Sequence, residues 1–316
     1  MERSYETSTK KLTFFELDDL KKHTTKDGSL SLYSLSYKEG FHDREGALRE
    51  SIAKYLLPAE LEQFSHTEKI FVLDVCMGLG YNTGSILERV LQSKIKIEWH
   101  GLEIDQRPLN LAMNEKIFLK TWSPEVLHFF DCLNGSGKWS DGFNKGTIHW
   151  GDARQKIYEI HDSIKFDLIL LDPFSPQKCP ELWSEEFISL LTERLSVEGR
   201  LITYSSAASI RASFKRAGLK IYSIVPSINN RKKWSSGTVA MKRKLAQKLI
   251  SKGCQLKDLS TREVEHLNTC SSIPYRDPTG KGNSKEIILR RELEQSKSQL
   301  INTSAWRKRW NSAQSQ

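Results

Sequence analysis

The feature that most constrains the fold of this sequence is an alternation of short apolar runs and longer helical segments between residues 70 and 241. Each run is bounded by turn residues, as buried strands are, and the intervening segments repeat apolar residues at helical spacing. The predicted strands cover 70–75, 95–102, 146–150, 166–172, 200–205, 219–225 and 237–242. The predicted helices between them cover 81–92, 107–119, 153–161, 183–195 and 207–217. This order predicts an α/β fold whose mostly parallel sheet is covered by helices on both faces.

The last two predicted strands are joined only by PSINNRKKWSS. Parallel neighbours need a crossover of about a dozen residues or more, so this pair is predicted to form an antiparallel hairpin with a basic tip. The expected architecture is therefore a Rossmann-like sheet of seven strands whose last strand is antiparallel.

Three regions are expected along the chain. Residues 1–65 form an N-terminal extension, in which 27–51 reads as a β-hairpin leading into a helix, and residues 66–244 form the core. Residues 245–316 form a basic extension, in which Ser260 and Glu263 predict a capping box and the final residues are expected to be mobile. Within the core, 119–145 is expected to be an insertion rich in turns.

Composition limits the class of protein. With 38% hydrophobic and 28% charged residues, the sequence is typical of a soluble globular protein. No apolar run approaches the roughly 20 residues of a membrane span, and MERSYETSTKKL lacks the apolar region of a secretory signal. The five cysteines are scattered without a C-x-x-C pair, which disfavours a disulfide framework and a structural zinc. We expect a cytoplasmic protein without a metal, a membrane association or an obligate protein partner.

The positive charge is concentrated in one part of the chain. From residue 226 onward there are 19 Lys and Arg against 7 Asp and Glu, a net charge of +12, while the whole chain carries +9. Residues 1–225 therefore carry −3. A basic C-terminal third suits a polyanionic partner such as a nucleic acid, and a solvated, solubilising surface explains it equally well.

A glycine turn follows the first predicted strand in LDVCMGLGYNTG. Asp74 ends the strand, Gly78 and Gly80 form the turn, and Asn82 opens the next helix. Glycine lets the backbone turn sharply and approach a ligand above the strand. A dinucleotide site prefers G-x-G-x-x-G, whereas the third glycine here arrives one residue late, as Gly84. The D-x-x-x-G-x-G form resembles motif I of class I methyltransferases, in which the acidic residue helps to hold the methionine end of the cofactor.

Acidic residues also end the next predicted strands. Glu103 ends the second strand, where a carboxylate can accept hydrogen bonds from both hydroxyls of a ribose. Asp152 and Ala153 follow the third, at the position where class I methyltransferases receive the adenine amine, although Asp152 is also a plausible helix N-cap. Asp172 ends the fourth. Because the carboxyl ends of parallel strands meet at one edge, these acidic groups are expected to face one crevice.

Asp172 begins the segment DPFSP, which resembles the D/N-P-P-F/Y motif of methyltransferases that act on amines. A carboxylate can accept a hydrogen bond or a proton from an amine, and the ring of Phe174 can stack on a nucleobase. We interpret Asp172 and Phe174 as the catalytic pair. The alternative is that DPFSP is only a rigid turn from a strand to a helix.

Several segments together resemble the methyltransferase domain of MnmC-type tRNA-modifying enzymes, in the form that lacks the flavin oxidoreductase half. They are DGSLSLYSLSYKEGFHDREGALRES, LDVCMGLGYN, GLEID, GDAR, LDPFSPQKCPELWS and PYRDP. The resemblance implies a class I methyltransferase that uses S-adenosyl-L-methionine to methylate the 5-aminomethyl group of the wobble uridine of tRNA. The product would be 5-methylaminomethyluridine or its 2-thio form. No second glycine-rich βαβ unit follows residue 242, so FAD is not expected.

The resemblance also gives further residues a role. Glu50, in GALRES, is a candidate cofactor contact, with a solvated helix position as the alternative. The predicted contacts to the anticodon region of tRNA are Arg231, Lys232, Lys233, Trp234, Lys242, Arg243, Arg290 and Arg291. Among them, Trp234 is either a stacking surface for a base or a core residue.

Two other functions share this pattern of residues. An aminopropyltransferase of the spermidine synthase type has the same core and an acidic site, but its cationic substrate is difficult to reconcile with a basic C-terminal third. A catalytically inactive RNA-binding relative would have no reason to keep four carboxylates at the ends of its strands.

Overall fold

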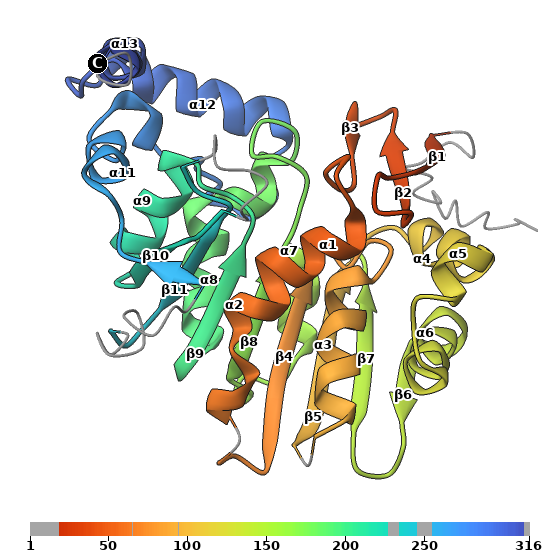
Figure 1. The fold of residues 1–316 in the computed structure, drawn as a ribbon. Coiled ribbons are helices and arrows are strands. Elements are labelled where there is room, and N and C mark those ends of the chain that lie inside the picture. The colour runs from red at the N-terminus through yellow and green to blue at the C-terminus, as the bar shows by residue number, and fades with distance from the viewer. Residues whose placement is uncertain (1–18, 65, 94, 227–233, 245–254, 313–316) are drawn as a thin grey trace, which may run out of the picture.

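The computed structural model describes residues 19–64, 66–93, 95–226, 234–244 and 255–312 (Figure 1). Its centre is a nine-stranded sheet with the order β12-β10-β11-β9-β8-β4-β5-β7-β6. The five strands from β9 to β7 are parallel, and β11 is antiparallel to both β9 and β10. The α/β class, the mostly parallel sheet and the antiparallel last strand of the core are confirmed.

Seven of these strands are the predicted ones. They are β4 (Lys69–Val75), β5 (Lys96–Glu103), β7 (Lys145–Trp150), β8 (Phe166–Leu171), β9 (Leu195–Thr203), β10 (Lys220–Ile224) and β11 (Thr238–Met241). The described chain adds two edge strands, β6 (Lys138–Ser140) and β12 (Leu256–Lys257). The predicted number of strands was too low because segments of three and two residues leave no apolar run in the sequence.

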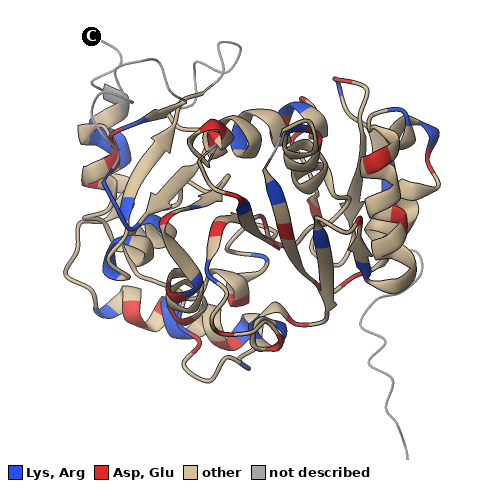
Figure 2. Ribbon diagram, turned by 90° about the horizontal axis from the view of Figure 1, so that it is seen from below, with Lys and Arg blue, Asp and Glu red and all other residues tan. Residues whose placement is uncertain are grey.

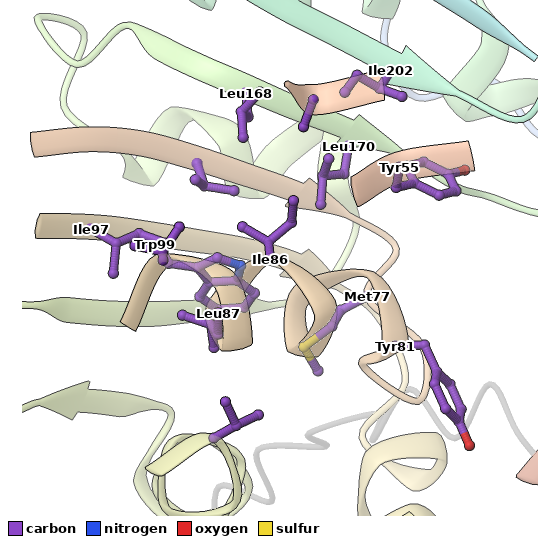
Figure 3. Close-up of a cluster of buried hydrophobic side chains, with 14 of the residues drawn as sticks. Tyr55, Met77, Tyr81, Ile86, Leu87, Ile97, Trp99, Leu168, Leu170 and Ile202 are labelled. Atoms are coloured by element: carbon purple, nitrogen blue, oxygen red, sulfur yellow. The ribbon is translucent and has the colours of Figure 1, made fainter. Parts of the chain in front are cut away.

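Helices cover both faces of the sheet (Figure 1). Those of the core are α3 (Tyr81–Leu91), α4 (Arg107–Met113), α5 (Lys116–Leu119), α6 (Pro124–Ser136), α7 (Ala153–Lys156), α8 (Glu185–Arg194) and α9 (Ala208–Arg216). Successive residues of β4 point to opposite faces, so Ile70 and Val72 pack in one buried cluster while Leu73 and Val75 pack in the other. Figure 3 shows the first cluster, where Ile86 and Leu87 lie near Ile97 and Trp99.

The segment 119–145 contains α6, so the expectation of a mere turn-rich insertion was wrong. Ser123 caps this helix by accepting a hydrogen bond from the amide of Val126, and Gly137 ends it with a φ of 74°. Its buried residues Val126, Phe129, Phe130 and Leu133 repeat at helical spacing. The loop residues that flank the helix concealed this pattern.

The N-terminal extension is a three-stranded antiparallel sheet followed by a helical segment. The strands are β1 (Leu20–Thr24), β2 (Leu30–Ser34) and β3 (Glu39–Gly40). The helical segment consists of α1 (Ala47–Ser51), a π-helical turn (Ile52–Leu56), α2 (Leu57–Ala59) and a 3-10 turn (Leu61–Phe64). Leu30, Leu32 and Tyr55 belong to the same buried cluster as β4 and α3, so the extension packs directly on the core.

The C-terminal extension contains α11 (Thr261–His266), α12 (Ser284–Lys297) and α13 (Thr303–Ser312). The predicted capping box of Ser260 and Glu263 is confirmed at the start of α11. The final residues, from 304 onward, were expected to be mobile. Residues 304–312 instead belong to α13, where Trp306 is buried with its ring stacked on His266, and residues 313–316 lie outside the described residues. No helix within the described ranges is both long and apolar enough to span a membrane.

Candidate active site

The turn between β4 and α3 has the backbone geometry that its glycines predict. Gly78 and Gly80 have φ values of 58° and 94°, in the left-handed region. A Cβ atom added to Gly80 would lie 2.6 Å from the ring of Phe130, so that position requires glycine. Cys76 also has a positive φ, of 67°. The whole turn is therefore held in a sharply bent shape at the carboxyl end of β4.

Glu103 lies beside this turn at the end of β5. Its carboxylate accepts hydrogen bonds from the amides of Gly78 (2.9 Å), Ile104 (2.7 Å) and Asp105 (2.9 Å). The side chain is buried, and this burial raises the pKa of Glu103 despite the three amide donors. The glycine turn and Glu103 were predicted to lie close together, and the hydrogen bond between Gly78 and Glu103 shows that they do.

Asp74 lies behind the turn, on the sheet face covered by α3. It is fully buried, and its Oδ2 accepts a hydrogen bond from the hydroxyl of Thr83. Its Oδ1 has no hydrogen-bond partner among the described residues. Burial raises the pKa of Asp74 to about 7. Asp74 therefore contacts the first turn of α3 through Oδ2, while Oδ1 is a buried acceptor that no described residue satisfies.

Asp172 follows β8, which is the neighbour of β4 in the sheet. Its Oδ1 accepts a hydrogen bond from the hydroxyl of Tyr55 at 2.5 Å, and its Oδ2 accepts one from the Asn82 amide at 2.7 Å. Burial, with the nearby charge of Glu50, raises the pKa of Asp172 to about 8, although both hydrogen bonds act in the opposite direction. The carboxyl group is thus fixed in position and is unusually basic.

Tyr55 was not predicted from the sequence. It lies in the π-helical turn between α1 and α2, a local widening of the helix that often occurs at functional sites. Its ring is buried, and 117 residues separate it from Asp172 in the chain. The apolar pattern of this segment gives no signal for a π turn, so sequence spacing could not place Tyr55 in the site.

Glu50 lies one helical turn before Tyr55. Its carboxylate accepts hydrogen bonds from the amide of Asp43 and from Lys54, and only 15% of its side chain is exposed. A solvated helix position is therefore excluded for Glu50. Its charge acts on Asp172, and its role as a cofactor contact stays a prediction.

Phe174 belongs to an aromatic cluster that the sequence did not reveal. Its ring stacks on Tyr37, with centroids 4.3 Å apart, and meets the edge of Phe41 at 5.0 Å. The backbone carbonyl of Phe174 accepts a hydrogen bond from the Trp183 indole, and that of Pro173 accepts one from the Tyr204 hydroxyl. The DPFSP segment, which Asp172 begins, is thus held rigidly, and a rigid turn is compatible with the interpretation of Asp172 and Phe174 as the catalytic pair.

The N-terminal sheet reaches over this cluster. Tyr37 and Phe41 flank β3, whose Glu39 accepts hydrogen bonds from the hydroxyl (2.7 Å) and the amide (3.2 Å) of Ser175. Phe41 also lies above the glycine turn, because a Cβ atom on Gly78 would be 3.3 Å from its ring. The extension therefore forms one wall of the candidate active site.

Asp152 caps α7, as the helix-cap interpretation predicts. Its side chain accepts a hydrogen bond from the Arg154 amide and is ion-paired with the Arg154 guanidinium at 2.7 Å. Arg154 in turn binds Asp277 of the PYRDP segment at 2.6 Å. Ala153 is buried next to the cap. The position remains at the same edge of the sheet as Glu103, since β5 and β7 are neighbours.

The candidate RNA contacts fall into different environments. Arg231, Lys232 and Lys233 lie outside the described residues. Trp234 is half-buried, with Arg211 and Arg262 above its ring. Lys242 donates to the carbonyl of Leu195, and Arg243 pairs with Glu198. Arg290 and Arg291 donate to carbonyls of the segment 271–276. The described basic residues therefore have intramolecular partners, and their contact with RNA stays a prediction.

The edge of the sheet is chemically suited to S-adenosylmethionine. The bent glycine turn brings backbone amides close to a ligand, and Glu103 presents a carboxylate next to that turn. The free Oδ1 of Asp74 offers a further buried acceptor. Within the described ranges, no group of three or more His, Cys, Asp or Glu residues is arranged to hold a metal ion.

Comparisons with known proteins agree with this geometry. Residues 139–240 match a family described as S-adenosyl-L-methionine-dependent methyltransferase. An uncharacterised protein of Methanocaldococcus jannaschii is 29% identical over 86% of this chain and 72% of its own length. The tRNA 5-methylaminomethyl-2-thiouridine biosynthesis bifunctional protein MnmC of Azoarcus sp. is 26% identical over 60% of this chain, but the match covers only 31% of that protein.

A solved structure gives the same relationship in three dimensions. The crystal structure of MNMC2 from Aquifex aeolicus is 28% identical, with a TM-score of 0.73, and the match covers 88% of this chain and 86% of that one. The fold, the match of residues 139–240 and these relatives together make the chain similar to S-adenosylmethionine-dependent methyltransferases of the MnmC type.

Proposed function

We propose that this protein methylates the 5-aminomethyl group of the wobble uridine in tRNA. The product is 5-methylaminomethyluridine or its 2-thio form. The observation that carries this proposal is the placement of Asp172, a fixed and unusually basic carboxyl group, beside an aromatic cluster at the carboxyl edge of the sheet. The MnmC relatives are named for the biosynthesis of the 2-thio form of this nucleoside.

Asp172 can act as the base that amine methylation requires at neutral pH. An alkylamine has a pKa of about 10.4, so it is protonated and non-nucleophilic at neutral pH. An ordinary carboxylate is too weak a base to change this, whereas burial raises the pKa of Asp172 to about 8. Asp172 can therefore accept a proton from the ammonium group at Oδ1 or Oδ2. Tyr55 and Asn82 hold those oxygens so that the amine lone pair faces the cofactor side of the site.

The aromatic cluster provides a place for the base that carries the amine. A base stacked on an aromatic side chain gains about 1–3 kcal/mol, and only an unstacked anticodon base can reach such a surface. Phe174 already stacks on Tyr37, so the base would contact the outer edge of the pair or take the place of Tyr37.

The cofactor would be held by the acidic residues at the neighbouring strand ends. Glu103 would accept hydrogen bonds from the ribose hydroxyls, Asp152 would receive the adenine amine, and the turn at Gly78 and Gly80 would pass close to the ligand. When bound, S-adenosylmethionine supplies a methyl group on a positively charged sulfur. The aromatic wall of Tyr37 and Phe41 would exclude water from that methyl group.

The test is methylation of tRNA that carries unmethylated 5-aminomethyluridine, followed by mass spectrometry of its nucleosides. The wild-type protein should convert the wobble amine to its monomethyl form. The variant Asp172→Asn should be at least about 100-fold slower, because a positioned base contributes that much or more, with unchanged affinity for S-adenosylhomocysteine. Conversion by wild type of any other nucleoside instead, or of decarboxylated S-adenosylmethionine with a polyamine, would refute the proposal.

A further inference from the structure

A second concave site lies on the N-terminal extension, outside the methyl-transfer site. It is a pocket of about 540 Å³ whose lining includes His23, Lys26, Tyr33, Gly40, His42 and Arg44. These residues come from β1, the turn after it, β2, β3 and the segment that follows β3. Its volume falls within the range of about 300–1,000 Å³ that is typical of small-ligand sites.

The lining of this pocket combines positive charge with rings. Lys26 and Arg44 are cationic and exposed, and no Asp or Glu is among the residues that line the pocket. Lys26 pairs with Glu45 at 2.6 Å, but both side chains are largely exposed, so this pair is weak. Tyr33 is 37% exposed and therefore offers part of its ring to a ligand. This combination matches a phosphate attached to a planar base.

His42 supplies a second, uncharged ring. Its Nδ1 is 3.0 Å from the Ser31 hydroxyl, and its ring meets the edge of Tyr81 at 5.2 Å. Burial lowers the pKa of His42 to about 4, so the ring is neutral at physiological pH. Lys26 and Arg44 therefore supply positive charge to the pocket, and His42 adds a neutral ring to it.

The pocket and the methyl-transfer site lie on adjacent residues of the chain. Phe41 contacts Phe174 with centroids 5.0 Å apart, and the next residue, His42, lines the pocket. The strand β3 lies between the two sites and is the edge strand of its sheet. Its residue Gly40 lines the pocket and has no side chain that would block a ligand crossing the strand. Neighbouring nucleotides of an RNA strand could therefore occupy the two sites while their backbone crosses β3.

We infer that this pocket binds a nucleotide that flanks the methylated base in the RNA substrate. The base stacks on Tyr33, and its phosphate is contacted by Arg44 and Lys26. The inference rests on the proposed function, because it requires an RNA substrate whose target base lies at Phe174. None of the RNA contacts predicted from the sequence lines this pocket, so the pocket is an additional subsite for the RNA.

The test compares Tyr33→Ala and Arg44→Ala with a matched control, Arg49→Ala. Arg49 is exposed on α1, five residues from Arg44, and does not line the pocket. Methylation kinetics are measured on an anticodon stem-loop with 5-aminomethyluridine at the wobble position. The KM of both pocket variants should rise about tenfold, in line with the loss of one stacked base or phosphate contact. The kcat and the affinity for S-adenosylhomocysteine should not change, and Tyr33→Phe should restore KM.

Three outcomes would overturn the inference. The first is a KM in both pocket variants that equals that of Arg49→Ala. The second is a parallel fall in kcat and cofactor affinity, which would show a structural role. The third is that Tyr33→Ala weakens the binding of uridine 5′-monophosphate but leaves the KM for the stem-loop unchanged. That result would assign the pocket to a free nucleotide. If wild type leaves the stem-loop unmethylated, the proposed function fails, and the dissociation constants of the same variants for the stem-loop still test the pocket.

Discussion

At the scale of single residues, the active site depends on opposing influences on Asp172. Burial and the charge of Glu50 favour its neutral form, while hydrogen bonds from Tyr55 and Asn82 favour its charged form. Burial prevails, and the pKa rises to about 8. The result is a carboxyl group that is mostly protonated at neutral pH and that binds a proton more strongly than a surface aspartate does.

The pH dependence of turnover follows from this shift. The proposed base is the carboxylate, which dominates only above its pKa, so kcat/KM should increase as the pH rises through about 8. A rate that is already maximal at pH 6 would contradict the assignment of Asp172. The measurement is a kcat/KM profile on the wobble-modified stem-loop.

Removing the hydroxyl of Tyr55 should shift the pH profile of kcat/KM to higher pH. This hydrogen bond lowers the pKa of Asp172, so Tyr55→Phe should raise the pKa and shift the midpoint of the profile to higher pH. The ring remains, so the packing around the buried Tyr55 is retained. Tyr158→Phe is the matched control, since Tyr158 is 66% exposed. A midpoint that stays in place, or moves to lower pH, would show that Tyr55 does not act on Asp172.

The sequence predicted only part of this site. Glu103 and Asp172 could be placed because each ends a strand, and parallel strands bring their carboxyl ends together. Tyr55, Tyr37 and Phe41 could not be placed, since their positions depend on a π turn and on the way in which the extension folds over the sheet. No periodicity in the sequence encodes either feature.

At the scale of secondary-structure elements, the strands and helices with long apolar patterns were predictable, whereas the short edge strands and α6 were not. The strand predicted at 70–75 is observed at Lys69–Val75, and the helix predicted at 81–92 is observed at Tyr81–Leu91. Edge strands of two or three residues bury too little to leave a pattern. The antiparallel position of β11 could be predicted because a short connection forbids a parallel crossover.

One link between elements is predicted to matter for both stability and the cofactor site. Asp277, which is 1% exposed, binds Arg154, and Arg154 holds the Asp152 carboxylate at the start of α7. Asp277→Ala leaves the guanidinium of Arg154, whose side chain is only 12% exposed, with one carboxylate fewer. The free energy of unfolding should fall by about 3 kcal/mol or more.

Chemical denaturation measures this loss, with Glu62→Ala as the control. Glu62 pairs with Arg89 on the surface, where the two side chains are 71% and 57% exposed, so its loss should cost less than about 1 kcal/mol. Equal losses in the two variants would show that the Arg154 link does not stabilise the fold.

At the scale of the whole molecule, the charge is divided unevenly. Residues from 226 onward carry 19 Lys and Arg against 7 Asp and Glu. Figure 2 shows that positive and negative residues nevertheless lie interspersed over much of the described chain. The helix α12 carries residues of both signs. By contrast, α13 contains Arg307, Lys308 and Arg309 without an acidic residue. RNA binding should therefore depend on local basic segments more than on the overall charge.

The salt dependence of tRNA affinity tests the predicted basic tip of the hairpin. Each phosphate contact contributes about 0.7–0.9 to the slope of log K against log salt concentration. Replacing Arg231, Lys232 and Lys233 with alanine should lower the steepness of that slope by about two to three. The matched control replaces Lys116, Lys120 and Lys138, which are exposed on the amino-terminal part of the core. Equal slopes in the two triple variants would remove the tip from the RNA interface.

The central claim is that cofactor and amine meet at Asp172, and a bisubstrate analogue measures it most directly. The analogue joins the adenosyl group of the cofactor to the amine nitrogen of 5-aminomethyluridine, and calorimetry gives its affinity beside that of S-adenosylhomocysteine. The wild-type protein should bind the analogue at least about 100-fold more tightly. Asp172→Asn should lose most of that gain while its affinity for S-adenosylhomocysteine stays the same. Equal affinities for the two ligands in wild type, or a gain that survives in Asp172→Asn, would contradict the claim.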